Sequence, residues 1–330
     1  MAWLIGIALL VVKLGLVLLV LLTLAAYLVL LERKFLARLQ IRYGPNRAGK
    51  YGLLQPLADT IKMLTKEDIV PEAADRLLFL MAPAVVATEA LLIFAVVPFG
   101  SNITVWGREI PLVIADLNVG LLYVFALASL GVYGVVIGGW AANSKYSLLG
   151  GIRGAAQMIS YELSLGLSLV PIVMLAKSFS LVDIVEAQAG YPFIVVQPVA
   201  FVIFLISAMA ETKRIPFDLP EAENELGAGY HTEYSGMRFG LFFLGEYVNL
   251  LVLGALVAVF FLGGWRGPWL PPLFWFLAKM ILVALFMIWV RGTLPRLRYD
   301  QLMHFGWKVL VPVALVNIVL TGGWLVLLNC

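Results

Sequence analysis

Residues 3–31 read WLIGIALLVVKLGLVLLVLLTLAAYLVLL, and Lys13 is the only charged side chain in this run. An α-helix needs about 20 apolar residues to cross the hydrocarbon core of a bilayer, whereas a barrel strand needs only about half as many. Backbone groups in lipid must be satisfied within the protein, so the run predicts a transmembrane helix. It lacks the basic start and short core of a cleaved signal peptide, and we expect it to remain as the first span.

The rest of the chain has the same character. Hydrophobic residues make up 62% of the sequence and charged residues 13%, which excludes an ordinary soluble domain because too little polar surface exists to solvate it. We predict an all-α integral membrane protein with about eight transmembrane helices, forming one membrane-embedded domain over residues 1–330. The expected spans are 3–31, 77–98, 119–142, 155–176, 193–210, 239–262, 270–290 and 309–328.

The distribution of basic residues predicts the orientation of these spans. Of the 23 lysines and arginines, 18 lie in the first, third, fifth and seventh connections, which cover residues 32–76, 143–154, 211–238 and 291–308. Cytoplasmic loops carry an excess of Lys and Arg. We therefore expect these connections in the cytoplasm and both termini on the periplasmic side.

The sequence contains few residues that could hold a metal or a redox group. Its one cysteine is Cys330, and its two histidines, His231 and His304, lie in separate polar segments. A disulfide, a zinc site, a cysteine-ligated cluster or a bis-histidine haem site cannot be built from this set. We expect no metal site and no redox centre in the chain itself.

The first cytoplasmic connection contains an amphipathic pattern. Leu54, Leu57, Ile61 and Leu64 repeat at helical spacing, and Pro56 stands where a first turn would begin. Charged side chains occupy the other face: Asp59, Lys62 and Lys66. The pattern predicts a short helix along the membrane surface.

The connection at 211–238 is acidic where basic residues are expected. Pro216 and Pro220 prevent one continuous helix. Glu221 and Glu225 would share a face if helical, and close carboxylates in a poorly solvated place raise one another's pKa, which would suit a proton relay. A solvated acidic loop that docks on a basic partner is the alternative, and spacing alone favours it.

Five ionisable residues fall within the expected spans: Lys13, Glu89, Glu162, Glu246 and Lys279. Each costs about 2.5–3.5 kcal/mol near the bilayer centre, so we expect them to face the bundle interior, water or one another. Internal Lys–Glu pairs or side chains that reach the interface are the structural alternatives. Glu162 is better placed for function, because Gln157, Ser160 and Tyr161 make one face of its helix polar.

Several stretches together resemble a known family: ERKFLAR (32–38), RYGPNR (42–47), LLQPLAD (53–59), KYSLLG (145–150), SYEL (160–163), PFDLPEAE (216–223) and GYHTEYS (229–235). They resemble the H-type subunit family of the proton-pumping NADH:quinone oxidoreductase, respiratory complex I. The likeness covers essentially the whole chain, and several long motifs in one order are more specific than any short pattern.

The resemblance implies a subunit of the bacterial inner membrane at the junction between the membrane arm and the peripheral arm. It implies that the substrate is a quinone, ubiquinone or menaquinone, and that no group is bound covalently. Iron–sulfur clusters and FMN are then expected only in partner subunits. The implied partners are the quinone-site and iron–sulfur subunits of the peripheral arm, other membrane-arm subunits and membrane lipid, and not nucleic acid.

The resemblance also implies roles for individual residues. The quinone chamber would be bordered by Arg33, Arg42, Asp59, Lys62 and Arg214. For the arginines, anchoring to lipid headgroups is a competing role. The start of the proton path would include Glu162, Glu211, Asp218, Glu221, Glu223 and Glu225. Some relatives place a further glutamate in the third span, where this chain has Ser129.

Two other functions remain as alternatives. A stand-alone ion-coupled transporter would also bury carboxylates among helices, but the sequence lacks a corresponding pair of broken spans in two halves. The membrane subunit of a related hydrogenase-type complex shares the same ancestry, and the full-length match argues against it.

Overall fold

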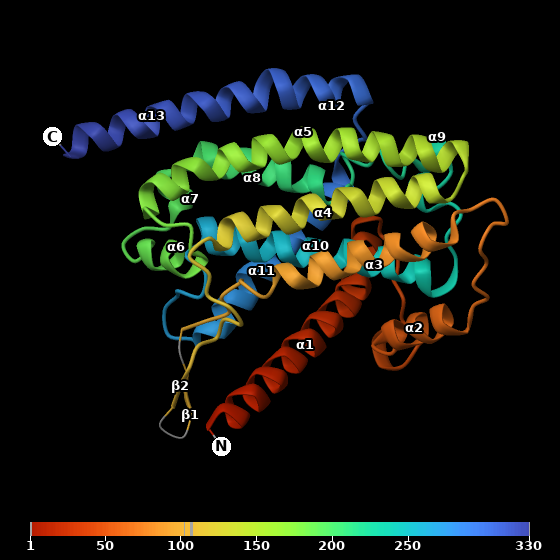
Figure 1. Ribbon diagram of the computed structural model, residues 1–330, viewed down its shortest axis with the longest axis horizontal. Helices are drawn as coiled ribbons and strands as arrows, with labels where there is room; N and C mark the ends of the chain where they lie inside the picture. The colour runs from red at the N-terminus through yellow and green to blue at the C-terminus, as the bar shows by residue number, and fades with distance from the viewer. Residues whose placement is uncertain (1, 102, 106–107, 330) are drawn as a thin grey trace.

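A computed structural model describes residues 2–101, 103–105 and 108–329. The side chains at 2–5, 7–9, 103–105, 108–110, 223, 224, 328 and 329 are outside the described set. The elements, shown in Figure 1, are α1 (Ala2–Leu39), η1 (Lys50–Gly52), α2 (Gln55–Thr65), α3 (Arg76–Ile93), β1 (Ile103–Val105), β2 (Arg108–Ile110), α4 (Gly120–Ala141), α5 (Lys145–Ala176), α6 (Leu181–Ala187), α7 (Phe193–Val196), α8 (Pro198–Glu211), α9 (Glu223–Leu226), η2 (Gly229–His231), α10 (Gly236–Phe261), α11 (Pro272–Thr293), α12 (Tyr299–Phe305), η3 (Gly306–Leu310) and α13 (Val311–Asn329).

The prediction of an all-α membrane protein is confirmed. Within the described ranges, seven helices are long and apolar enough to cross a bilayer: α1, α3, α4, α5, α10, α11 and the continuous stretch from α12 to α13. The shorter apolar helix α8 joins them. The exception to the helical pattern is a small antiparallel hairpin of β1 and β2, in which Ile103 pairs with Ile110.

The fifth predicted span is not one continuous helix. It divides at Gln197, whose backbone (φ −130°, ψ 58°) is not helical, and Pro198 then opens α8. The residue before a proline is driven away from the helical region, which accounts for the break. The 14 residues of α8 cover roughly 21 Å, less than the ~30 Å of hydrocarbon.

Because α8 is short, the segment that follows it lies beside an interior turn of α5 and not beside the first residues of α5. Gln157, about three turns into α5, donates from Nε2 to the carbonyl oxygens of Ala210 and Phe217 at 2.7 and 2.6 Å. These bonds hold both sides of the 211–217 turn against the buried face of α5.

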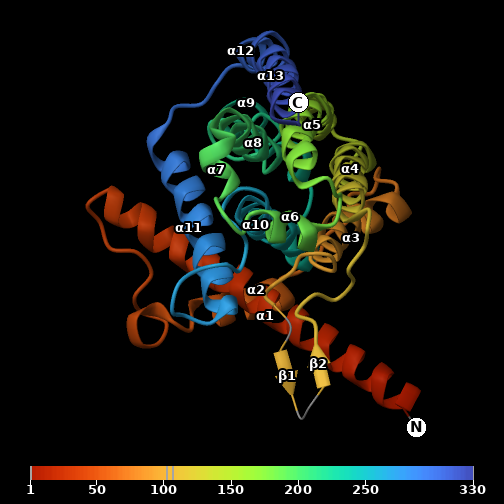
Figure 2. The ribbon, with the colours of Figure 1, turned by 90° about the vertical axis from the view of Figure 1, so that its left-hand side faces the viewer.

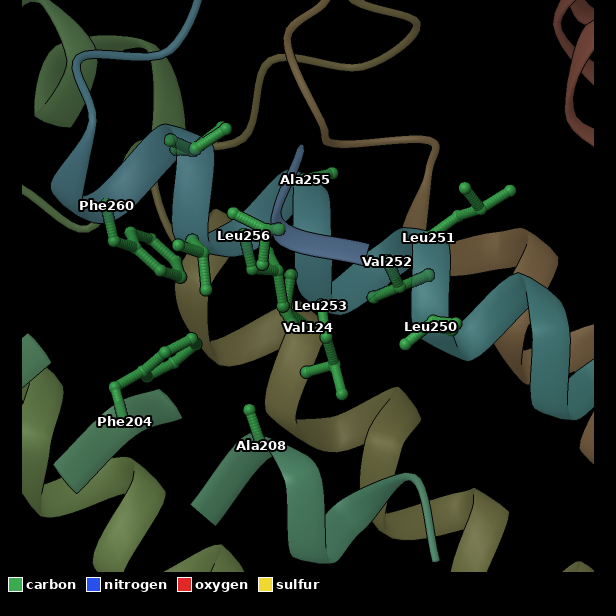
Figure 3. Close-up of a cluster of buried hydrophobic side chains, with 14 of the residues drawn as sticks. Val124, Phe204, Ala208, Leu250, Leu251, Val252, Leu253, Ala255, Leu256 and Phe260 are labelled. Atoms are coloured by element: carbon green, nitrogen blue, oxygen red, sulfur yellow. The ribbon is translucent and has the colours of Figure 1, made fainter. Parts of the chain in front are cut away.

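Helix α10 forms the centre of the bundle. Figure 2 views the bundle along its helices and shows α10 inside a ring of the other long helices. In Figure 3 the side chains of Leu253, Leu256 and Phe260 point toward Phe204 of α8 and toward Val124 of α4. The Phe204 and Phe260 rings meet edge to face with centroids 6.0 Å apart. An apolar helix surrounded on all sides is expected to be hydrophobic all round, as α10 is from Leu250 to Phe261.

The predicted surface helix is confirmed as α2, with Pro56 in its first turn. Its apolar side chains Leu57, Ile61 and Leu64 are exposed. Figure 1 shows α2 and α9 at one end of the bundle, with both chain termini toward the opposite end.

Helices α4 and α5 approach each other closely at a pair of glycines. A Cβ atom on Gly139 would lie 2.5 Å from the Ser147 carbonyl oxygen and 3.1 Å from the Gly151 Cα atom. Both of these are backbone atoms, which cannot turn aside as a side chain can. The hairpin of α4 and α5 therefore depends on the absence of a side chain at 139.

We predict that Gly139→Ala destabilises the protein by about 1–3 kcal/mol, since the helix backbones must separate. The measurement is the midpoint of thermal unfolding in detergent. Gly166→Ala in α5 is the matched control, because its nearest heavy atom, Phe125 Cζ, would be 4.0 Å from the new Cβ. Equal midpoints for the two variants would contradict the close approach.

Candidate functional site

A network of four charged side chains, of which Arg214 and Glu32 are buried and Arg291 is 34% exposed, lies where α1, α10 and α11 meet the segment after α8. Arg214 donates from Nη1 to Glu32 Oε2 and from Nε to Glu246 Oε1, both at 2.7 Å. Arg291 of α11 also donates to Glu32. The Arg214 guanidinium lies 4.4 Å from the ring centroid of Tyr247. One buried guanidinium thus links two helices to the segment.

The charges of this network balance. The side chains of Arg214 and Glu32 are 3% and 4% exposed, and that of Glu246 is 15% exposed. Burial by itself would lower the pKa of Arg214, but the carboxylates of Glu246 and Glu32 outweigh it and hold the pKa above its ordinary value. Buried ions of this kind are stable only when paired and hydrogen-bonded, as they are here.

A second group of charges follows along the same segment. Arg296 contacts Asp218, with Nη2 3.5 Å from Oδ2, and it also donates to the Asp218 carbonyl oxygen. Glu221 lies beyond Pro220. Burial of its carboxyl group, with the nearby charges of Glu246 and Asp218, raises the pKa of Glu221 to about 8. This carboxyl can take up or release a proton near neutral pH.

Further into the bundle, α3, α4, α5, α8 and α10 enclose a cavity of about 40 Å³. Its polar lining consists of Glu89, Glu162, Glu211, Lys213 and Asn249. Because a water molecule needs about 10–15 Å³ of such space and several polar partners, the cavity can hold about two or three waters. A short hydrated connection between the carboxylates is therefore possible.

Glu162 lies at the boundary of this cavity. Its Oε1 accepts a hydrogen bond from Ser129 of α4. Glu162 also borders a groove of about 550 Å³ on the outside of the bundle, which Phe125 and Trp307 help to line. Glu162 therefore separates the interior cavity from the lateral surface.

Three of the five predicted quinone-site residues meet at the corner between α1 and α2. Arg33 Nη1 lies 2.8 Å from Asp59 Oδ2, and Lys62 Nζ lies 3.9 Å from Asp59 Oδ1. Arg42 is apart from them and donates to Gln40 Oε1 at 2.7 Å. Arg214, the fifth, belongs to the buried network.

The predicted acidic cluster is divided. Ala222 has non-helical backbone angles (φ 16°, ψ 60°), so Glu221 and Glu225 do not share a helix face as the spacing allowed. Glu225 is exposed and pairs with Arg153 at 2.6 Å, which keeps the pKa of Glu225 below its ordinary value. Glu211 and Glu162 meet at the cavity instead. The side chain of Glu223 is outside the described residues.

Sequence reasoning missed the partners of Arg214. Glu246 was an ionisable residue of unassigned role within a span, Glu32 was only the first residue of the ERKFLAR motif, and Arg291 was only one of the basic residues counted in the connection 291–308. Their position in or next to the spans could have indicated this role, because ionisable side chains there usually face the bundle interior and pair with an opposite charge.

The two intramembrane lysines have a different role from the Lys–Glu pairing considered above. Lys13 donates to the carbonyl oxygens of Pro111 and Val113. Lys279 donates to those of Leu262, Gly264 and Arg266 at 2.6–2.9 Å. Both ammonium groups therefore hold connecting segments at the end of the bundle away from α2.

Known proteins of one family match almost the whole chain. A family model described as NADH dehydrogenase matches residues 12–322. The second H-type subunit of NADH-quinone oxidoreductase in Syntrophobacter fumaroxidans is 76% identical over 322 residues, which cover 98% of this chain and 97% of the relative. The first H-type subunit of Geobacter metallireducens is 68% identical over 96% of each chain, and the second of Rhizobium meliloti is 51% identical over 98% of this chain and 99% of the relative. The chain belongs to the family of H-type subunits of NADH-quinone oxidoreductase.

Proposed function

We propose that this chain helps to form the quinone chamber of an NADH-quinone oxidoreductase and begins the path that couples quinone reduction to proton movement. Family membership makes the chain a multi-pass membrane subunit of that multi-subunit enzyme, whose substrate is a quinone. Its own contribution is charge and shape, and the electrons come from partner subunits. The proposal favours this role over a stand-alone transporter because the relatives are subunits of an oxidoreductase.

The observation that carries the coupling proposal is the half-buried Glu221 carboxyl group, whose pKa is raised to about 8 by desolvation and by the nearby charges of Glu246 and Asp218. A change of charge on a quinone near this group would alter whether it holds a proton. Glu246, which contributes to the raised pKa, is itself bound to Arg214. A proton gained or lost at Glu221 therefore changes the electrostatic potential at the buried ion network.

Lys213 provides the link from Glu221 to the cavity. Its ammonium charge lowers the pKa of Glu221, against the larger effect of burial, and Lys213 also lines the cavity that contains Glu211 and Glu162. In our proposal, gain or loss of a proton at Glu221 changes the net charge around Lys213. This change alters the proton affinity of the carboxylates in the cavity. The path then leads through Glu211 to Glu162 and the lateral groove.

The chamber itself is proposed at the corner between α1 and α2. The exposed apolar face of α2 suits an isoprenoid tail or lipid, while Arg33, Asp59 and Lys62 offer charge and hydrogen bonds beside it. Arg42 extends this basic edge. Peripheral-arm subunits would cover the corner, and other membrane-arm subunits would cover the lateral groove.

The orientation is also a proposal. The basic residues gather in the connections at the α2 end, which we assign to the cytoplasm, and both termini lie toward the periplasm. Quinone from the membrane and electrons from a cytoplasmic arm would then meet at the same edge.

For the proton path, Glu162→Gln and Glu211→Gln should each lower turnover and proton uptake about tenfold, because an amide cannot carry the proton. Quinone reduction and proton uptake are measured with the intact complex in proteoliposomes. Glu186→Gln, at an exposed position of α6, is the control. Normal values in both cavity variants would exclude these residues from the path.

For Glu221, the raised pKa gives a definite pH dependence. The stability that comes from burying the protonated acid is complete below the ordinary pKa of a glutamate and is lost as the pH rises through about 8. The wild-type complex should therefore lose thermal stability between about pH 5 and pH 8, the interval between the ordinary and the raised pKa. Glu221→Gln cannot ionise and should lose less, whereas the exposed Glu67→Gln should follow the wild type. Parallel curves for all three would show that Glu221 does not titrate in this range.

For the chamber, Asp59→Asn should raise the KM for quinone several-fold with a smaller effect on kcat, because it releases Arg33 from its carboxylate partner. An exposed ion pair adds only about 0–1 kcal/mol to stability, so folding should be unaffected. Asp300→Asn breaks the comparable exposed pair with Arg298 and serves as control. An unchanged KM in Asp59→Asn would favour the headgroup-anchoring role for this corner.

A further inference from the structure

Glu89 is a buried acid that the proposed path does not use. It lies on α3 and is 4% exposed. Its Oε1 accepts a hydrogen bond from Asn249 Nδ2 at 3.0 Å, while its Oε2 has no partner among the described residues. A carboxyl oxygen left without a partner in such a place is costly if charged, so the group needs either a proton or water.

The bundle leaves a specific space for this carboxyl group. A Cβ atom on Gly131 of α4 would lie 2.7 Å from Glu89 Oε1 and 3.0 Å from its carboxyl carbon. Any other residue at 131 would therefore displace the acid. The glycine makes a hollow in α4 into which Glu89 reaches from α3.

This hollow opens into the enclosed cavity. The charged groups that face Glu89 there are Glu162 from α5, Glu211 from the end of α8 and Lys213 from the following segment, with Asn249 from α10 as the neutral neighbour. Glu211 Oε2 is also buried without a described partner. Three carboxyl groups face one ammonium group. Full ionisation would leave an excess of negative charge in a closed space, so the set favours holding protons.

Glu89 also borders a second space. A groove of about 300 Å³ on the lateral surface between α3 and α4 is lined by Glu89 together with Thr88, Leu92 and Leu127. The same carboxyl-bearing side chain thus lines the interior cavity on one side and an open groove on the other. Glu162 has the corresponding position at the groove beside Trp307.

We infer that Glu89 is a further proton-binding residue of this chain, which exchanges a proton with Glu211 through the cavity and connects the cavity to the groove between α3 and α4. This inference rests on the proposed proton path and adds a branch to it. In the exchange, an O–H bond breaks at Glu211, a water in the cavity carries the proton, and an O–H bond forms on Glu89. No electrons move, and the Glu211 carboxylate left behind faces Lys213.

The test uses the intact complex in proteoliposomes, with infrared difference spectra between its oxidised and reduced states. Glu89→Gln should remove the C=O stretching band of a protonated acid and lower proton uptake about tenfold. Glu89→Asp, which keeps an acid, should restore at least part of the uptake. Loss of uptake in both variants with no change in the infrared band would overturn the inference, because the residue would then act only through packing.

Gly131→Ala provides a second test, which retains the acid. The clash is with the flexible end of Glu89, so the fold should survive while the carboxyl group moves. We expect the infrared band to shift and proton uptake to fall several-fold. Gly15→Ala in α1, where a new Cβ has no heavy atom within 4 Å, should match the wild type. Gly131→Ala decides the question if Glu89→Gln does not assemble, and an unshifted band with normal uptake would overturn the inference.

The outcome is separable from the proposed path. If proton uptake is impaired in Glu162→Gln and Glu211→Gln but normal in Glu89→Gln and Gly131→Ala, the branch through Glu89 is removed and the proposed path remains. Normal uptake in the Glu162 and Glu211 variants, with loss in Glu89→Gln and recovery in Glu89→Asp, would contradict both the path and the exchange with Glu211. It would leave Glu89 as a proton-binding residue on its own.

Discussion

The position of the segment after α8 depends on one guanidinium group enclosed between two carboxylates. Arg214 is buried with Glu32 and Glu246, and each ion is tolerated only because the others are present. Removing one member of such a set costs about 3–5 kcal/mol, since a charge is left unpaired in a poor solvent. The segment after α8 therefore cannot leave the bundle without separating opposite charges. This fixes its acids at a constant depth and orientation.

The same constraint would favour the proposed electrostatic coupling. In water, charges several ångströms apart interact weakly, but partial burial lowers the effective dielectric constant and strengthens the interaction. The network, the Glu221 carboxyl and the cavity follow one another along a single segment, with Lys213 next to Arg214 in the chain. Rigid ion pairs and short distances allow a local change of charge to bias neighbouring protonation without a large movement of the backbone. That is the physical basis on which we place the coupling path in this chain.

Hydropathy was sufficient to predict the membrane helices, and amphipathic spacing was sufficient for α2, because both depend on local patterns. The break at Gln197 was missed because the apolar run continues through it, and only the conformational effect of Pro198 distinguishes it. The pairing of Arg214 with Glu32 spans 182 positions and could not be read from spacing. Glu221 and Glu225 were grouped on the assumption of a helix that Ala222 does not permit. Local rules therefore gave the elements, while the charge partners arose from packing.

The short length of α8 bears on the electrical behaviour of the site. Its 14 residues fall roughly 9 Å short of the hydrocarbon thickness, so in the proposed orientation, with Pro198 at the opposite interface, Glu211 would lie about a third of the way into the insulating layer. A full crossing is worth about 2.3 kcal/mol per charge for each 100 mV, so a proton that reached Glu211 on the proposed path would have traversed part of the membrane voltage, worth roughly 0.7 kcal/mol per 100 mV. The membrane voltage would then act directly on the protonation of Glu211 and would oppose the first step of proton pumping.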